Sequence, residues 1–217
     1  MGKNGHATSK IRNENCSFSC PENRTGQIEL LDEMAAQSID YIVLRKPNMD
    51  SDSLIAFTEQ LSNRTLAKLI VSDINIFSQF KVKGFHFKRA FLNQSSQKKI
   101  NEIKELAKAR QQIISVSCHQ KEDFILMGQD YDIVFVSPVF DTISKVSNNT
   151  NWKLSELKNL FSNKTKKGNY FALGGVNNTN ISKLKEIGFD GLGILGYIWT
   201  NQNEPLMQLN KLVLACQ

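Results

Sequence analysis

Three residues near the middle of the chain have side chains that can bind an anion together. Thr142 and Ser144 carry hydroxyl groups and Lys145 carries an ammonium group, all within four residues. Hydroxyl groups donate hydrogen bonds to phosphate oxygens and a lysine adds a positive point charge, so the three can converge on one phosphate group. An ordinary polar turn has a similar composition and is the main alternative interpretation.

The residues before this cluster favour the phosphate interpretation. Residues 133–136 are four consecutive apolar residues, mostly β-branched. Such a run without polar alternation is typical of a strand in a parallel sheet that helices cover on both faces. Pro138 then removes a backbone donor and ends the strand. Because ligand-binding residues of barrels and open α/β folds lie at the carboxyl ends of the strands, the cluster is well placed to bind a ligand.

The elements that would position these residues alternate regularly along the chain. Strands are predicted at residues 16–20, 39–44, 68–73, 84–87, 112–117, 133–136, 170–173 and 191–195. Apolar residues at helical spacing predict helices at residues 28–35, 54–61, 97–110, 122–129, 154–161, 177–187 and 206–213. This repetition predicts an α/β fold, a single-domain (β/α)8 TIM barrel over residues 15–217 after a polar tail at 1–14. The alternative, a doubly wound open sheet, lacks its Gly-x-Gly-x-x-Gly fingerprint.

Composition restricts the class of partner. The chain has 217 residues, with 27 Lys and Arg against 21 Asp and Glu, and its formal charge of +6 favours anionic ligands. Its lysine pairs have no interleaved aromatic residues, so no nucleic-acid partner is expected. The absence of a long apolar run and of a signal-peptide core predicts a cytoplasmic protein with no membrane partner. The four cysteines show no Cys-x-x-Cys spacing, and free thiols are expected.

In a barrel, the strand ends bring a cationic and hydroxyl-rich set of residues to one rim. That set is Arg45, Lys46, Asp73, His86, Ser117, His119, Thr142, Ser144, Lys145, Gly174, Gly175 and Gly196. Glycines after the last two predicted strands let backbone amides approach a phosphate closely, although glycines also occur in ordinary turns.

Asp73 and the two histidines each allow more than one interpretation. Asp73 could ligate Mg²⁺, which takes one or two carboxylates and fills its other positions with water and phosphate oxygens. It could equally cap a following helix. His86 and His119 lack metal-ligand spacing with each other and with Cys118, so a structural or substrate-binding role is favoured over zinc.

These strand-end segments resemble, in order and spacing, the thiamine phosphate synthase and TenI (thiazole tautomerase) superfamily. The resemblance extends over residues 16–199, and its most specific part is residues 137–145, Ser-Pro-Val-Phe-Asp-Thr-Ile-Ser-Lys. The weaker parts are Leu44-Arg45-Lys46, Val71-Ser72-Asp73, Gly84-Phe85-His86-Phe87, Ser115 to His119 and Gly174-Gly175-Val176.

The resemblance implies a transferase of thiamine biosynthesis on a (β/α)8 barrel, coupling an aminopyrimidine diphosphate to a thiazole phosphate. In that family pattern Arg45 and Lys145 bind the diphosphate, Asp73 holds Mg²⁺ and Ser117 lies by the pyrimidine. The thiazole phosphate is then bound by Thr142, Ser144, Gly175 and the backbone at Leu195 and Gly196. Lys46, His86, His119 and Gly174 complete the expected substrate-binding set, and a homodimer is a candidate assembly.

The sequence also departs from the family pattern at four positions. A polar residue, a lysine, an asparagine and an aspartate of the family are replaced here by Val43, Pro47, Ser72 and Phe91. Each replacement removes a diphosphate or Mg²⁺ contact, and the histidine of the tautomerase branch is Pro138. Two alternatives to the synthase therefore stay open: a divergent, tautomerase-like enzyme acting on a thiazole phosphate, and a non-catalytic binder of phosphate ligands.

Overall fold

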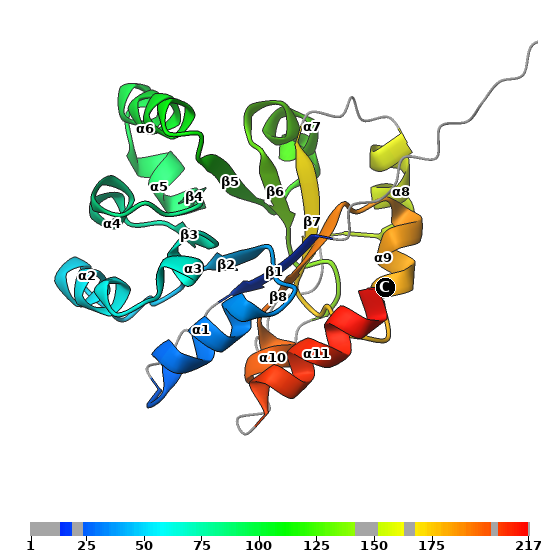
Figure 1. Ribbon diagram of the computed structural model, residues 1–217. Coiled ribbons are helices and arrows are strands. Elements are labelled where there is room, and N and C mark those ends of the chain that lie inside the picture. Colours follow the sequence, from blue (N-terminus) through cyan, green and yellow to red (C-terminus); the bar gives the residue numbers. More distant parts are fainter. Residues whose placement is uncertain (1–13, 19–23, 142–151, 163–167, 201–203, 217) are drawn as a thin grey trace, which may run out of the picture.

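Eight parallel strands close into one barrel in the order of the sequence, and helices surround it (Figure 1). The computed structural model describes residues 14–18, 24–141, 152–162, 168–200 and 204–216. The strands are β1 (Glu14–Phe18), β2 (Tyr41–Val43), β3 (Leu69–Val71), β4 (Gly84–Phe87), β5 (Ile113–Cys118), β6 (Ile133–Val136), β7 (Asn169–Leu173) and β8 (Gly191–Ile194). Pairing of β1 with β8 closes the barrel, so no strand edge is left open.

Two packed regions stabilise the barrel. Val43, Ile70, Ile133, Phe135 and Phe171 fill its interior. A larger apolar layer lies between the strands and the helices, and it takes the alternate residues of the same strands, such as Val134 and Val136 of β6. Successive side chains of a strand point to opposite faces, and in this barrel both faces are buried, which explains the continuous apolar runs in the sequence.

The helices connect the strands and bury one side of each against the sheet. They are α1 (Gln27–Ala36), α2 (Ser51–Glu59), α3 (Asn63–Leu66), α4 (Ile74–Gln79), α5 (Arg89–Gln94), α6 (Gln97–Ala109), α7 (Lys121–Asp130), α8 (Leu154–Ser162), α9 (Ile181–Ile187), α10 (Gly196–Trp199) and α11 (Pro205–Cys216). Capping side chains determine where several helices begin. At the start of α2, for example, the Asp50 side chain accepts a hydrogen bond from the Ser53 amide at 2.8 Å. None of the helices among the described residues has the length and apolar character that a membrane crossing requires.

The predicted barrel is confirmed, with local differences. Strands β4 and β6 have the predicted bounds, whereas β1 begins at Glu14 and takes one residue of the expected polar tail. Three short helices, α3, α5 and α10, were not predicted, and α4 was expected only as the helix that Asp73 could cap. Helix α9 begins at Ile181 rather than at residue 177, because the Asn180 side chain accepts a hydrogen bond from the Asn177 amide at 3.0 Å and holds a turn there.

Candidate active site

Arg45 and Lys46 follow strand β2 but occupy different environments. Tyr41 and Val43 contact the barrel interior, and the two-residue period of a strand places Arg45 on that same row. Lys46 is only 6% exposed, its ammonium group donates to the Gln27 side-chain oxygen, and it lies 5.3 Å from the centre of the Phe57 ring. The structure therefore does not support Lys46 as a substrate-binding residue, because its charge is directed into the helix layer.

His86 lies inside the barrel between two serine hydroxyl groups. Its Nδ1 is 3.0 Å from the Ser115 hydroxyl and its Nε2 is 3.2 Å from the Ser117 hydroxyl, while its ring packs edge-on against Phe135. The pKa of His86 is lowered from 6.5 to about 3, mainly because the ring is buried and in smaller part because of the nearby charges of Lys88, His119 and Arg45. The imidazole is therefore neutral, and both of its nitrogens are occupied by the protein.

This arrangement limits the access of a ligand to His86. The residue is only 6% exposed and its Nε2 lies against the Ser117 hydroxyl, so its expected role in binding substrate stays a prediction. Ser117 is half-buried at the end of β5, so it is the member of the pair that can reach a ligand. The sequence did not single out Ser115, which is fully buried in an apolar strand and pairs with a residue 29 positions away.

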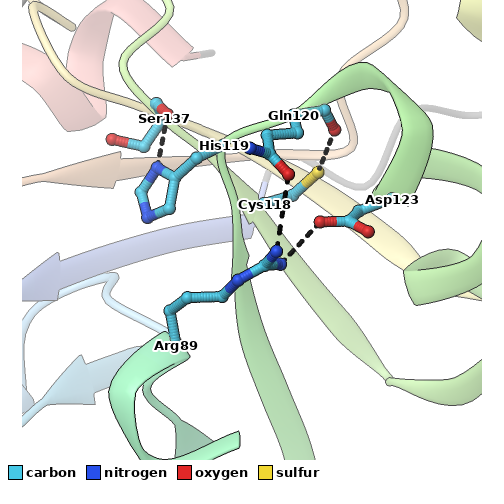
Figure 2. Close-up of polar contacts among 6 residues, drawn as sticks. All are labelled: Arg89, Cys118, His119, Gln120, Asp123 and Ser137. Atoms are coloured by element: carbon cyan, nitrogen blue, oxygen red, sulfur yellow. Dashed lines mark hydrogen bonds and ion pairs between the residues drawn. The ribbon is translucent and has the colours of Figure 1, made fainter. Parts of the chain in front are cut away.

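Past Ser117, the end of β5 is tied to its neighbours by polar contacts (Figure 2). The ring of His119 is exposed and donates from Nδ1 to the Ser137 carbonyl oxygen at 2.7 Å. Arg89 of α5 reaches across to Asp123 of α7, with 2.5 Å between the charged atoms, and to the Gln120 side-chain oxygen at 3.4 Å. Arg89 and Asp123 were not predicted from the sequence as residues beside the rim, since neither directly follows a strand. Their ion pair joins α5 to α7 beside the rim.

The ends of β6 and β7 are held together where the phosphate-binding cluster was predicted. The backbone amides of Val139 and Phe140 donate to the carbonyl oxygens of Leu173 and Gly174 at 3.0 and 3.2 Å. Gly174 and Gly175 have φ angles of 90° and 66°, which favour glycine. A Cβ atom on Gly175 would lie 2.6 Å from the Phe140 Cβ atom, so only glycine allows this close approach.

Thr142, Ser144 and Lys145 themselves lie outside the described residues. The chain that leads to them is nevertheless placed, because the Asp141 carbonyl oxygen would be 2.7 Å from a Cβ atom on Gly175. On the other side of the same turn, the Gly175 carbonyl oxygen accepts hydrogen bonds from the side chains of Asn177 and Asn180 at 3.3 and 2.9 Å. Asp141, the last described residue before the predicted cluster, therefore lies directly beside the Gly174-Gly175 turn.

The end of β8 supplies the remaining glycine. Leu195 precedes α10, and Gly196 is its first residue, with open space around it, since an added Cβ atom would meet nothing within 4 Å. In barrel enzymes the phosphate site is frequently formed by the loops after strands 7 and 8 and by a short extra helix. Leu195 and Gly196 occupy this position, as do Gly174 and Gly175.

Asp73 caps α4, which confirms one of its two predicted roles. Its Oδ1 accepts hydrogen bonds from the amides of Asn75 and Ile76 at 2.9 and 3.1 Å, and its Oδ2 accepts one from the Ser51 hydroxyl at 3.1 Å. Lone-pair capacity remains on Oδ2, so Asp73 fits as one ligand of a Mg²⁺ ion that also binds substrate phosphate. Among the described residues, no group of three or more His, Cys, Asp and Glu side chains is arranged to hold a metal.

A wide groove of about 940 Å³ lies away from these residues. Lys83 and Gln112, which precede β4 and β5, line it together with residues at the end of α4. It is therefore at the amino ends of the strands, whereas chemistry in barrels occurs at the carboxyl ends. Of the predicted site residues that the structure describes, none lines this groove.

Comparison with known proteins agrees with this location of the site. A family model described as thiamine monophosphate synthase matches residues 17–198, which include the carboxyl ends of all eight strands. The chain belongs to the thiamine monophosphate synthase family. A thiamine-phosphate synthase of Prochlorococcus marinus (strain AS9601) is 25% identical over 211 residues, which are 93% of this chain and 57% of that protein. The chain thus spans just over half the length of this curated relative.

Solved structures give the same architecture. A thiamine phosphate pyrophosphorylase from Bacteroides thetaiotaomicron has a TM-score of 0.75 and 19% identity, and the match covers 94% of this chain and 96% of that one. One from Pyrococcus furiosus has a TM-score of 0.72 and 16% identity, with 95% and 96% covered. At these identities the likeness establishes the barrel fold.

Within the family pattern, the four departures have identifiable surroundings. Val43 is buried in the barrel interior and Phe91 packs edge-on against Phe85 and Phe87, so both replacements extend the apolar packing. Pro47 is exposed and Ser72 is half-buried. Val43 and Phe91 therefore place apolar side chains where the family pattern has polar ones, whereas Arg45, Ser117 and the glycine turns follow that pattern.

Proposed function

We propose that the protein makes thiamine phosphate by joining an aminopyrimidine diphosphate to a thiazole phosphate. The observation that carries this proposal is the family match over residues 17–198, which includes every strand end of the barrel. The arrangement of the rim supports it. Arg45 lies near enough to His86 to lower its pKa, and Ser117 is bonded to the same ring, so a cation and a polar group converge beside the end of β5.

The reaction needs a stabilised leaving group. In the proposed step the bond between the pyrimidine-methyl carbon and the diphosphate oxygen breaks, and its electron pair leaves with the diphosphate. The thiazole nitrogen then supplies the electron pair for the new bond to the methyl carbon. Arg45 would hold diphosphate oxygens bidentately, and Lys145 would add a second positive charge. Fixed positive groups stabilise charge that develops in the transition state, so Arg45 and Lys145 would carry much of the catalysis.

Asp73 would hold Mg²⁺ together with oxygens of the substrate diphosphate. When bound, Mg²⁺ would neutralise part of the charge on that leaving group. Asp73 has one carboxylate oxygen committed to the cap of α4, so its contribution is through Oδ2. A site with a single carboxylate depends on ligands that the substrate brings, and Mg²⁺ is therefore expected to bind with the diphosphate rather than before it.

The thiazole phosphate would bind between the turn at Gly174 and Gly175 and the start of α10 at Gly196. Thr142 and Ser144 would donate their hydroxyl protons to the same phosphate group. The close contact of Gly175 with Phe140 and Asp141 supports this assignment, because these two residues immediately precede the predicted cluster in the chain. His119, whose ring is exposed on the neighbouring β5 end, remains a predicted substrate-binding residue.

Further expectations from the sequence accompany this proposal. The expected partners are small phosphorylated substrates, with no nucleic acid and no membrane. The expected location is cytoplasmic, and a homodimer is the candidate assembly. Exposed apolar side chains on α7 and α11, such as Leu126 and Leu214, offer surfaces that a second copy could cover.

A non-catalytic binder of phosphate ligands is the second candidate. The observation that favours it is the apolar packing of Phe91 against Phe85 and Phe87, at the position where the family pattern has a second carboxylate. Such a binder would retain the phosphate contacts at the glycine turns. It would lack the contacts that stabilise a departing diphosphate.

Replacing Arg45 by Lys separates the two candidates. A lysine keeps the charge but loses bidentate contact, so a synthase should lose turnover at least about tenfold while its affinity for the thiazole phosphate stays within about twofold. Turnover is measured as thiamine phosphate formed, and affinity by calorimetric titration. As a matched control, Lys98→Arg on the exposed face of α6 should change neither value. Equal losses of turnover and of thiazole phosphate affinity would contradict the assigned role of Arg45.

A further inference from the structure

The proposed reaction assigns no role to His86, a polar residue of the barrel interior. His86 is buried and bonded through both ring nitrogens, with Ser115 on one side and Ser117 on the other. A histidine that only filled the barrel could be replaced by an apolar side chain, as at Ile133 and Phe135 of the neighbouring β6. The direction of its hydrogen bonds determines where the Ser117 hydroxyl proton points.

The carbonyl oxygen of Phe85 sets that direction, since a carbonyl can only accept. The Ser115 hydroxyl is fully buried and points its proton to this carbonyl, with 3.5 Å between the oxygens. The Ser115 oxygen is then free to accept from the protonated Nδ1 of His86 at 3.0 Å. The lone pair of Nε2 remains, and it accepts the Ser117 hydroxyl proton at 3.2 Å.

The opposite arrangement satisfies fewer contacts. If Nε2 carried the ring proton, Ser115 would send its own proton to Nδ1, and the contact between the Ser115 and Phe85 oxygens would contain no proton. A doubly protonated ring is also disfavoured, because burial and the charges of Arg45, Lys88 and His119 hold the pKa of His86 at about 3. A single ring proton on Nδ1 is the arrangement that uses all three contacts.

We propose that His86 is a positioning residue that turns the Ser117 hydroxyl proton inward, so that Ser117 presents its oxygen to the ligand as a hydrogen-bond acceptor. Ser117 then selects a ligand group that donates a hydrogen bond and disfavours one that only accepts. The amino group of an aminopyrimidine is such a donor. This last assignment rests on the proposed function, whereas the direction of the Ser117 hydroxyl does not.

Binding experiments test the selectivity. The probes are the aminopyrimidine diphosphate and the same compound without its amino group, titrated calorimetrically. Wild type should bind the amino compound about tenfold more tightly, which is the scale of one hydrogen bond. Ser117→Ala and His86→Phe should both reduce this ratio toward one, and His86→Gln, whose side-chain oxygen can accept, should restore part of it. A ratio near ten in Ser117→Ala or in a folded His86→Phe protein would overturn the proposal.

The decisive measurement is the tautomer of His86 in the unmodified protein. In ¹⁵N-histidine-labelled protein, long-range proton–nitrogen spectra distinguish a protonated nitrogen from one with a lone pair, and the His86→Gln variant identifies the signal among three histidines. We expect a protonated Nδ1 and an unprotonated Nε2 from pH 5 to pH 8. A protonated Nε2 overturns the proposal, even in an active synthase. The expected tautomer in a protein that binds no aminopyrimidine would instead sustain the inference and refute the proposed function.

Discussion

His86 is one residue whose proton affinity changes strongly when the barrel forms. Its pKa falls from 6.5 to about 3 because the folded protein buries it. Between these values the unfolded chain binds a proton that the folded chain does not, so the free energy of unfolding rises with pH over this interval. The slope contributed by one proton reaches about 1.4 kcal/mol per pH unit. Stability should therefore fall as the pH is lowered from 7 to 5.

A variant isolates this contribution from those of the carboxylates. His86→Gln cannot titrate, so its free energy of unfolding should depend less steeply on pH between 7 and 5 than that of wild type. Urea unfolding at pH 7, 6 and 5 gives the two slopes. Parallel slopes would mean that His86 keeps its ordinary proton affinity in the folded protein.

Lys46 and Arg45 show how neighbouring cations take different roles. Lys46 bonds the buried Gln27 side chain, so Lys46→Met should lower the free energy of unfolding by about 1–3 kcal/mol, the cost of leaving a buried polar group without its partner. The exposed Lys98→Met should change it by no more than about 0.5 kcal/mol. Urea unfolding measures both. If Lys46→Met left the free energy of unfolding unchanged but weakened diphosphate binding, Lys46 would be a substrate-binding residue after all.

At the level of single residues, the sequence predicted some positions because strand geometry determines them. The carboxyl end of a strand already locates Arg45 and Ser117, whereas Lys46 was expected beside Arg45 at the rim and the structure directs it into the helix layer. Ser115 could not be recognised, because a serine in an apolar strand gives no sign of a partner 29 residues away. Long-range pairs of this kind depend on strand register, which the barrel sets as a whole.

Among the elements, α4 connects stability to the candidate metal site through Asp73. The Asp73 side chain caps this helix with two backbone contacts, and asparagine is an equally good cap. Asp73→Ala should therefore lower the free energy of unfolding by about 0.5–2 kcal/mol, whereas Asp73→Asn should stay close to wild type. Both variants should lose the dependence of activity on Mg²⁺. An Asp73→Asn protein with unchanged Mg²⁺ dependence would exclude Asp73 as a ligand.

The elements also show where sequence patterns are informative. The runs at residues 84–87 and 133–136 give strands with the predicted bounds. The second run is uniformly apolar, and a short segment of this kind between turn residues has few alternatives. Helices α3 and α10 have four residues each, which is too short for a helical period to appear in the sequence. The start of α9 was predicted too early, since the side chain of Asn180 forms a turn that apolar spacing cannot reveal.

For the whole molecule, closure of eight strands explains why distant residues form one site. Arg45 and Gly175 follow β2 and β7, Ser117 lies at the end of β5, and a closed parallel barrel brings all carboxyl ends to one rim. The formal charge of +6 favours anionic substrates at that rim. The fold could be predicted from the sequence because eight strand patterns are separated, with one exception, by helix patterns. The placement of Thr142, Ser144 and Lys145 stays a prediction, since these residues lie outside the described ones.

The proposed activity is tested most directly by measuring both products of one reaction mixture. The protein is incubated with the aminopyrimidine diphosphate, the thiazole phosphate and Mg²⁺, and thiamine phosphate and diphosphate are quantified over time. We predict that both form in equal amounts, that neither forms when one precursor is omitted, and that Ser117→Ala lowers both rates equally. Calorimetric binding of both precursors without any thiamine phosphate would contradict the synthase assignment and identify the protein as a binder of these phosphate ligands.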